Sequence, residues 1–242
     1  MQILRLILQF LKRGAWRDIY HVFRYARVSY AQFGEDLVVF HALGHKPGFY
    51  VDAGALHPVY LSNTYLLHKN GWRGVNIDAS RKTIELFQRL RPGDINLHAA
   101  LSNEECDIDF CTFGDISGVN YIVEAGSKAD NTITTAPPQA RTRMRTKTLK
   151  QLLDAHLPAG TVIDLLTVDC EGQDLNVLRS NDWARYRPRM IMIEDWQDEE
   201  KSEVVAFCRD KGYRLIATCH LTRIFQLREE AVSTQGWSPV GR

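Results

Sequence analysis

The sequence lacks paired cysteines and an excess of charge of either sign. Its cysteines are odd in number, and no two of them form a C-x-x-C pair: Cys106, Cys111, Cys170, Cys208 and Cys219. This pattern argues against a disulfide framework or a zinc knuckle and favours a reducing compartment. A formal net charge of +1 over 242 residues gives no reason to expect nucleic-acid binding, which needs a basic excess. No nucleic-acid partner is therefore predicted.

A long apolar run is also missing. Residues 3–11 are apolar but interrupted by Arg5, and they fall far short of the ~20 residues that cross a bilayer. Basic residues follow this run, whereas in a secretory signal they precede it. We expect residues 1–28 to form an amphipathic helical extension and residues 29–242 to form one domain. The extension would either contact an anionic membrane surface or pack on the domain or across a homo-oligomer interface. The expected location is cytoplasmic, with membrane-peripheral attachment as the variant that this helix suggests.

From residue 49 onward, apolar strand patterns alternate with helical ones, which predicts right-handed crossovers and a parallel sheet. The expected strands are 49–53, 73–78, 95–101, 106–113, 162–169, 189–194, 213–219 and 222–228, and the expected helices are 62–69, 81–90, 148–156, 173–179 and 198–211. The last two strands form an antiparallel hairpin. The predicted fold is α/β, with a mostly parallel seven-stranded Rossmann-like sheet of the kind found in class I methyltransferases.

Residues 114–138 are polar with weak periodicity, and we expect a long loop there. A loop of this length is usually functional, so residues 114–140 are predicted to lie on the substrate side. Basic residues then alternate from Arg141 to Lys147. This pattern favours a solvated edge strand protected by charge, with contact to an anionic substrate or lipid as the alternative.

Acidic residues stand at the ends of four predicted strands: Asp52, Asp78, Asp169 and the pair Glu194-Asp195. The carboxyl ends of parallel strands meet at one edge of a sheet, where ligands bind in open α/β folds. We therefore interpret these residues as a ligand-binding rim, although capping of the following helices would explain any single one of them.

The turn after the first strand contains Gly54 but lacks the other glycines of a dinucleotide-binding loop. A cofactor with a ribose and no pyrophosphate fits better, and S-adenosylmethionine (SAM) is such a cofactor. Asp78 would accept hydrogen bonds from the ribose diol, and Asp52 would suit the methionine amine. Gly54 would let the backbone approach the ligand closely.

Several motifs occur in the order of a known family. They are the segments 32–36 (QFGED), 51–58 (VDAGALHP), 62–64 (SNT), 70–79 (NGWRGVNIDA) and 168–174 (VDCEGQD). Over about residues 30–228 the chain resembles the FkbM-type SAM-dependent methyltransferases. The resemblance implies O-methylation of a sugar hydroxyl in a glycan, glycolipid or glycosylated metabolite. Leu56 departs from the pattern, because the family commonly has a polar residue there.

The resemblance also implies which residues hold the cofactor. Asp52 and Gly54 would hold the methionine end, Asp78 the ribose, and Ser102 would lie near the adenine. The complete predicted set is Gln32, Glu35, Asp52, Gly54, Asn63, Asp78 and Ser102.

The acceptor site is expected at the second group of acids. Asp169, Glu194 and Asp195 offer hard oxygen ligands that suit Mg²⁺, and they resemble the acids of macrocin-type sugar O-methyltransferases. These acids would otherwise bind sugar hydroxyls or cap helices without metal. His57, Asp169 and Glu171 are the candidate catalytic acids or bases.

Two other functions stay open at this point. One is methyl transfer to a hydroxyl or carboxyl of a lipid or peptide. The other is a membrane-docked binding protein that keeps the fold without turnover.

Overall fold

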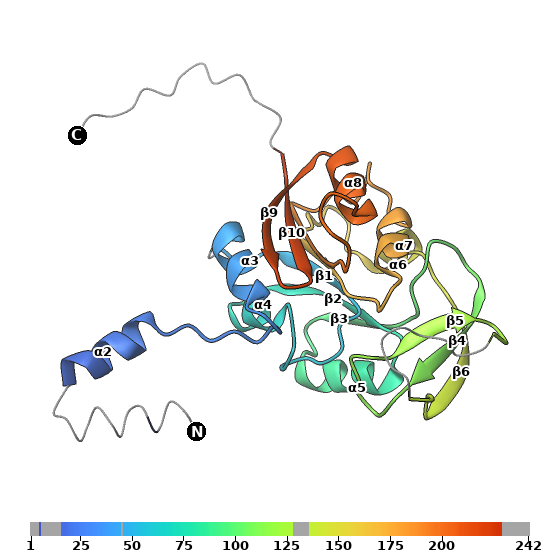
Figure 1. Cartoon of the computed structure of the whole chain (residues 1–242), viewed down its shortest axis with the longest axis horizontal. Coiled ribbons are helices and arrows are strands. Elements are labelled where there is room, and N and C mark those ends of the chain that lie inside the picture. Colours follow the sequence, from blue (N-terminus) through green and yellow to red (C-terminus); the bar gives the residue numbers. More distant parts are fainter. Residues whose placement is uncertain (1–4, 6–15, 45, 128–135, 229–242) are drawn as a thin grey trace, which may run out of the picture.

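The computed structural model describes residue 5 and residues 16–44, 46–127 and 136–228. Helices and strands alternate along most of this length (Figure 1). The elements are α2 (Trp16–Tyr25), α3 (Glu35–Leu43), β1 (Phe49–Ala53), α4 (Tyr65–Lys69), β2 (Arg73–Asp78), α5 (Arg81–Leu90), β3 (Ile95–His98), β4 (Asp107–Thr112), β5 (Tyr121–Glu124), β6 (Ala140–Arg145), α6 (Leu149–His156), β7 (Leu165–Val168), α7 (Asp174–Arg179), β8 (Met190–Glu194), α8 (Glu203–Asp210), β9 (Tyr213–Cys219) and β10 (Thr222–Leu227).

The main sheet has seven strands in the order β3-β2-β1-β7-β8-β10-β9. The first five are parallel to one another, and β10 is antiparallel to both of its neighbours. The predicted mostly parallel seven-stranded sheet with a C-terminal antiparallel hairpin is confirmed. The chain moves outward from β1 to β3 and then returns to β7 on the other side of β1. This places a switch point between β1 and β7, where open α/β sheets bind ligands.

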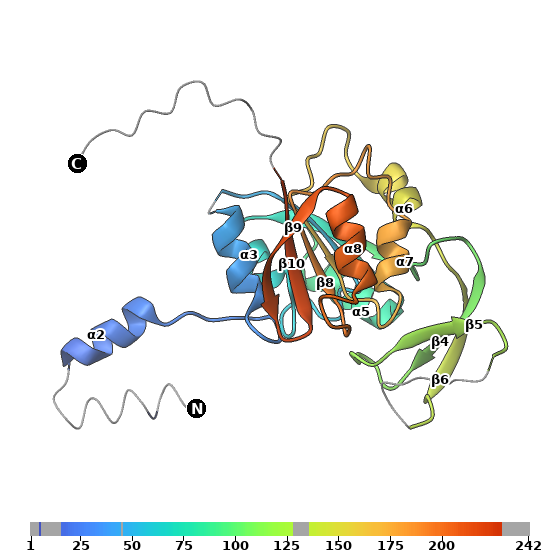
Figure 2. The same cartoon turned by 45° about the horizontal axis from the view of Figure 1, so that its top comes forward.

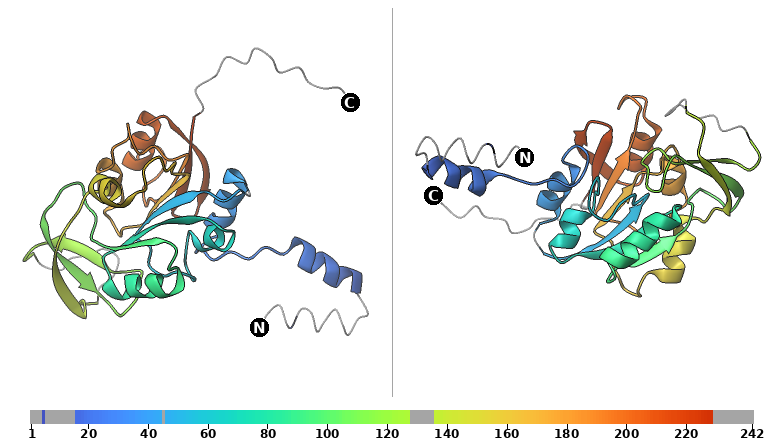
Figure 3. Two further views of the ribbon diagram at one scale, coloured as in Figure 1. Left: turned by 180° about the vertical axis from the view of Figure 1, so that it is seen from behind. Right: turned by 90° about the horizontal axis from the view of Figure 1, so that it is seen from below.

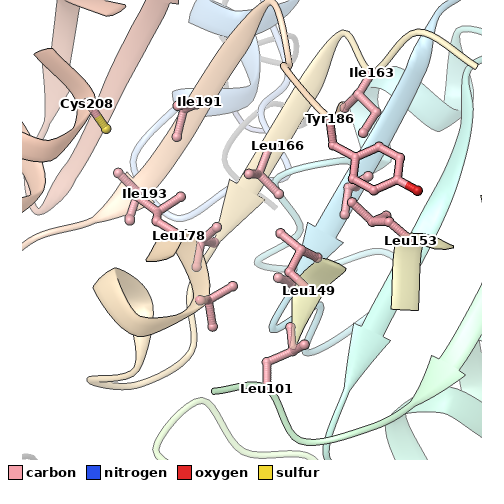
Figure 4. Packing of buried hydrophobic residues seen from close by; sticks show 14 of the residues in the cluster. Leu101, Leu149, Leu153, Ile163, Leu166, Leu178, Tyr186, Ile191, Ile193 and Cys208 are labelled. Atoms are coloured by element: carbon pink, nitrogen blue, oxygen red, sulfur yellow. The ribbon is translucent and has the colours of Figure 1, made fainter. Parts of the chain in front are cut away.

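Alternating side chains of the strands build a core on each face of the sheet. Val51 and Ala53 of β1 belong to a large buried cluster that includes residues of α6, α7 and α8, and Figure 4 shows part of this packing. Tyr50, on the opposite face, packs with Val39 of α3 and Leu67 of α4. Helices therefore cover both faces (Figure 3), as expected for a parallel sheet whose strands are buried on both sides.

A second sheet interrupts the alternation between β3 and α6. It has three antiparallel strands in the order β5-β4-β6 and lies beside the main sheet (Figure 2). The expectation of a continuous loop over 114–138 is therefore wrong in part, because residues 121–124 form β5. Residues 128–135 lie outside the described part of the chain.

β6 is an edge strand of this small sheet, as the alternating basic pattern predicted. Two of its basic residues pair with acids, one in β4 and one in the segment that precedes β4. Arg143 contacts Asp109, and Arg145 contacts Glu105. The charges therefore protect an exposed strand edge.

The N-terminal helix stands apart from the sheet (Figure 1). Residues 16–25 of the predicted extension are helical, and most of its first fifteen residues lie outside the described part. Tyr20, Phe23 and Tyr25 expose more than half of their surface. Among the described residues, no helix is both long and apolar enough to traverse a membrane.

Gly54 lies at the switch point, where the loop after β1 meets the loop after β7. The loops after β1 and β7 continue the strand pairing, since Asp169 N–H donates to the Ala53 carbonyl at 2.9 Å. A Cβ on Gly54 would overlap the carbonyl group of Asp169, and the glycine has a φ of +85°. Gly54 thus approaches the backbone of a neighbouring loop closely, and the close approach that we expected between Gly54 and a ligand stays a prediction.

We predict that Gly54→Ala destabilises the protein more than Gly172→Ala. Both glycines have positive φ, which costs a non-glycine residue about 1–2 kcal/mol, but a Cβ on Gly172 meets nothing within 4 Å. Gly54→Ala adds an overlap with the backbone, which costs about 1–3 kcal/mol more. Urea unfolding of both variants measures the difference, and equal losses of stability would contradict the contact.

Candidate functional site

A cavity of about 390 Å³ opens at the carboxyl ends of β1, β2, β7 and β8. Its walls come from the segment before α3, the loops after β1, β2, β3, β7 and β8, the β4–β5 connection and the β9–β10 turn. Residues 117–122 belong to this wall, so part of the predicted substrate-side segment 114–140 does face the cavity.

Asp78 lies at one end of the cavity with both carboxylate oxygens fixed. One oxygen accepts from Leu56 N–H at 3.0 Å and the other from Ser80 N–H at 2.7 Å. Burial raises the pKa of Asp78 to about 6, against the lowering effect of these two bonds. Each oxygen keeps a further lone pair for a ligand hydroxyl. The neighbouring wall is small and apolar, with Ala79, Ala100 and Phe110.

Three carboxylates gather at the other end, where Asp169 and Glu171 follow β7 and Glu194 ends β8. All three line the cavity. Burial raises the pKa of Asp169 well above its usual value, with repulsion from Glu194 as the next cause. Burial and repulsion from Glu194 and Asp174 raise the pKa of Glu171 to about 8. Burial also raises the pKa of Glu194. Groups whose pKa values are shifted toward neutrality are typical of catalytic sites.

Backbone strain is concentrated around the same cavity. Leu56, Leu61 and Glu171 have φ values of 50°, 49° and 48°, in the left-handed region that side chains other than glycine rarely adopt. All three line the cavity. Strain of this kind persists where the surrounding structure fixes it, often at ligand sites.

The remaining predicted cofactor residues divide into two groups. Gln32, Glu35, Gly54 and Asn63 line the cavity with Asp78. Asp52 and Ser102 are buried but do not form part of its wall. Asp52 accepts a hydrogen bond from Thr64 Oγ1 at 2.6 Å, and the Ser102 hydroxyl is directed to Asn103 and Gln173.

His57 is also placed outside the cavity wall. Its Nδ1 accepts from the N–H groups of Val59 and Tyr60, at 3.0 and 3.2 Å, and its ring lies against Tyr60. Burial lowers the pKa of His57. The Nδ1 atom of His57 therefore stabilises the turn after β1. Of the three candidate catalytic residues, Asp169 and Glu171 line the cavity.

The expected metal site of Asp169, Glu194 and Asp195 does not assemble. The Asp195 carboxylate accepts from Ser202 Oγ and from Arg223 Nε, both at 2.6 Å, and it is buried away from the cavity. In the described part of the chain, no group of three or more His, Cys, Asp or Glu side chains converges as metal ligands would. The three residues therefore do not fit a Mg²⁺ centre.

Arg91 holds the segment that follows β1 in place, and this role could not be found from the sequence. Its guanidinium is fully buried and donates to Pro58 O, to Ser62 Oγ and Thr64 Oγ1 at 2.9 Å each, and to Tyr50 OH at 3.2 Å. These bonds fix the segment between β1 and α4. They also explain why the helix predicted from residue 62 begins at Tyr65, since residues 62–64 are held by Arg91.

The sheet order, with one antiparallel strand next to the edge, defines a Rossmann-like methyltransferase fold, and the cavity lies at its switch point. The family model described as "Methyltransferase FkbM domain" matches residues 52–215, which is more than half of the chain. The chain belongs to the FkbM methyltransferase family, as the sequence motifs predicted.

Among solved structures, the chain is similar to one titled "delta-N METTL16 MTase domain". The likeness covers 78% of this chain and 77% of that chain, with 11% sequence identity and a TM-score of 0.36, which is too low to bear on function. No curated protein sequence matches the chain.

We predict that Glu171→Gln stabilises the protein at alkaline pH. The pKa of Glu171 is about 8 in the folded state against an ordinary value of 4.5, so the native state holds the proton more tightly than the unfolded state does. The wild-type protein therefore loses stability as pH rises from about 4.5 to 8, and glutamine removes this loss.

Thermal unfolding at pH 5 and pH 8.5 measures this effect. The melting temperature of Glu171→Gln should exceed that of the wild type by about 2–8 °C at pH 8.5 and by much less at pH 5. Asp115→Asn, at an exposed carboxylate, serves as the control. An equal difference at both pH values would contradict the raised pKa.

Proposed function

We propose that the protein is a SAM-dependent O-methyltransferase that acts on a hydroxyl of a sugar in a glycan, glycolipid or glycosylated metabolite. One observation carries the proposal. A single cavity combines a fixed carboxylate at the end of β2 with a group of ionisable carboxylates at the ends of β7 and β8. The carboxylate at the end of β2 suits a ribose, and the carboxylates at the ends of β7 and β8 suit the activation of a hydroxyl.

The cofactor end fits an adenosyl group. Asp78 has acceptor capacity left for a ribose diol, and a small apolar wall at Ala79, Ala100 and Phe110 suits a flat base. When bound, SAM supplies an activated methyl group on a positively charged sulfur. The acidic lining favours such a cation, because none of the lining residues in the described part of the chain is lysine, arginine or histidine.

Glu171 is the best candidate for the general base. Methyl transfer to oxygen forms an O–C bond, breaks the S–C bond and releases the hydroxyl proton, which a carboxylate would accept. The Glu171 carboxylate lines the cavity, and a pKa of about 8 lies close to the working pH, where general bases are most effective. Asp169 lies beside it as the alternative acceptor of the proton.

Asp78→Ala should weaken SAM binding about 10- to 100-fold, since hydrogen bonds to a charged group contribute about 1.5–3 kcal/mol. Isothermal titration of SAM into the wild type and the variant measures this loss. Asp115→Ala, at an exposed carboxylate outside the cavity wall, is the matched control and should bind SAM as the wild type does. Equal affinity of Asp78→Ala and the wild type would contradict the assignment of the ribose site.

We also propose peripheral attachment of the N-terminal segment to an anionic membrane. Residues 1–27 contain six basic residues and one acidic residue, a net charge of +5, so the rest of the chain carries −4. The exposed side chains of Tyr20, Phe23 and Tyr25 on α2 are of the type that lies at a membrane interface. The basic charge and the exposed aromatic side chains thus both favour contact with an anionic membrane.

The full-length triple variant Phe23→Ser, Arg24→Gln, Arg27→Gln should lose membrane binding. Each basic residue near an anionic surface contributes about 1 kcal/mol, so we expect a loss of at least about tenfold. Flotation with vesicles of phosphatidylserine and phosphatidylcholine measures binding, and Arg89→Gln on the exposed side of α5 is the control. Unchanged flotation of the triple variant would contradict the proposal.

A further inference from the structure

The cavity wall contains more carboxyl groups than a SAM-sized ligand can balance once they are ionised. Among the described residues that line it are five acids and no lysine, arginine or histidine; the acids are Glu35, Asp78, Asp169, Glu171 and Glu194. Bound SAM would bring an ammonium, a sulfonium and a carboxylate, which amount to one net positive charge. Several carboxylates would then remain without a counter-charge.

Two of the five acids already have donors from the protein. Asp78 accepts from two backbone N–H groups, and Glu35 accepts from Phe33 N–H at 2.7 Å and from Thr222 Oγ1 at 3.2 Å. These two side chains are fixed and satisfied without a ligand.

The other three acids form the unsatisfied group. Glu194 Oε2 is buried without a hydrogen-bond partner. Within the described residues, no hydrogen bond to the carboxylate of Asp169 or Glu171 is formed. Burial raises the pKa of all three acids, and repulsion from neighbouring carboxylates adds to this for Asp169 and Glu171, while a hydrogen bond from Trp196 opposes it for Glu194.

Three basic residues of neighbouring elements are paired within the protein. Arg91 is buried against Pro58, Ser62 and Thr64, and Arg223 is buried in its ion pair with Asp195. Lys82, next to the cavity-lining Thr83, pairs with Asp115. An anionic acceptor would therefore meet carboxylates and none of these three cations, while a cationic acceptor would meet the three carboxylates of Asp169, Glu171 and Glu194.

We propose that the acceptor carries a positive charge near the methylated hydroxyl, as a protonated amine on a sugar does, and that Asp169, Glu171 and Glu194 select for it. This inference rests on the proposed function and narrows its substrate class to amino sugars and similar cationic polyols. The same three acids disfavour uronic acids and phosphorylated sugars, because a like charge in a buried site is costly.

The test is isothermal titration of glucosamine, glucose and glucuronate into the full-length protein saturated with S-adenosylhomocysteine, in EDTA at pH 7. Glucosamine should bind at least about tenfold more tightly than glucose, a difference of about 1.4 kcal/mol, and glucuronate should bind most weakly. The variants Glu171→Gln and Glu194→Gln should each reduce the preference for glucosamine. Glu85→Gln, at an exposed carboxylate outside the cavity wall, should keep it.

The outcomes separate this inference from the proposed function. If S-adenosylhomocysteine binds and the three sugars bind equally or not at all, the inference is wrong while the cofactor site stands. If S-adenosylhomocysteine fails to bind, both are wrong. If Mg²⁺ binds to the wild type but not to Glu194→Gln, and no preference for glucosamine exists, the negative charge serves a metal and the inference is overturned.

Discussion

The site depends on the contact between Gly54 and the backbone of Asp169 at the switch point of the sheet. The chain leaves this point through β1, β2 and β3, and it returns through β7 and β8. Because glycine has no Cβ, the two loops meet closely enough for one cavity to extend across both halves. The half that carries Asp78 is thereby joined to the half that carries Asp169, Glu171 and Glu194.

The second constraint is electrostatic: the buried carboxylates lower the stability of the folded protein but suit the proposed function. Burying several carboxylates beside one another raises their pKa values, which means that the folded protein resists their ionisation. A core selected only for stability would pair them, as Asp195 is paired with Arg223. Their arrangement around a cavity instead provides an environment for a cationic cofactor and a poised base. Ligand binding would relieve part of the repulsion.

The sequence predicted the main sheet well, because strand and helix periodicities are local and the alternation limits the possible topologies. It also predicted that Asp52, Asp78, Asp169 and the pair Glu194-Asp195 would share one edge of the sheet, since strand ends of a parallel sheet lie together. Asp78, Asp169 and Glu194 line the cavity at this edge, and Asp52 does not. The sequence could not predict which way a side chain turns once it is there. Asp195 follows Glu194 directly but faces Arg223, a partner from β10, and His57 is captured by local backbone N–H groups. The short strand β5 was missed because four residues give no clear periodicity.

The most direct measurement is a crystal structure of the protein with SAM. The account predicts the ribose diol on the Asp78 carboxylate and the sulfonium methyl group facing Asp169, Glu171 and Glu194. A structure with the adenosyl group bound elsewhere, or with its methyl group turned away from these three acids, would contradict the central claim that this cavity is the site of methyl transfer.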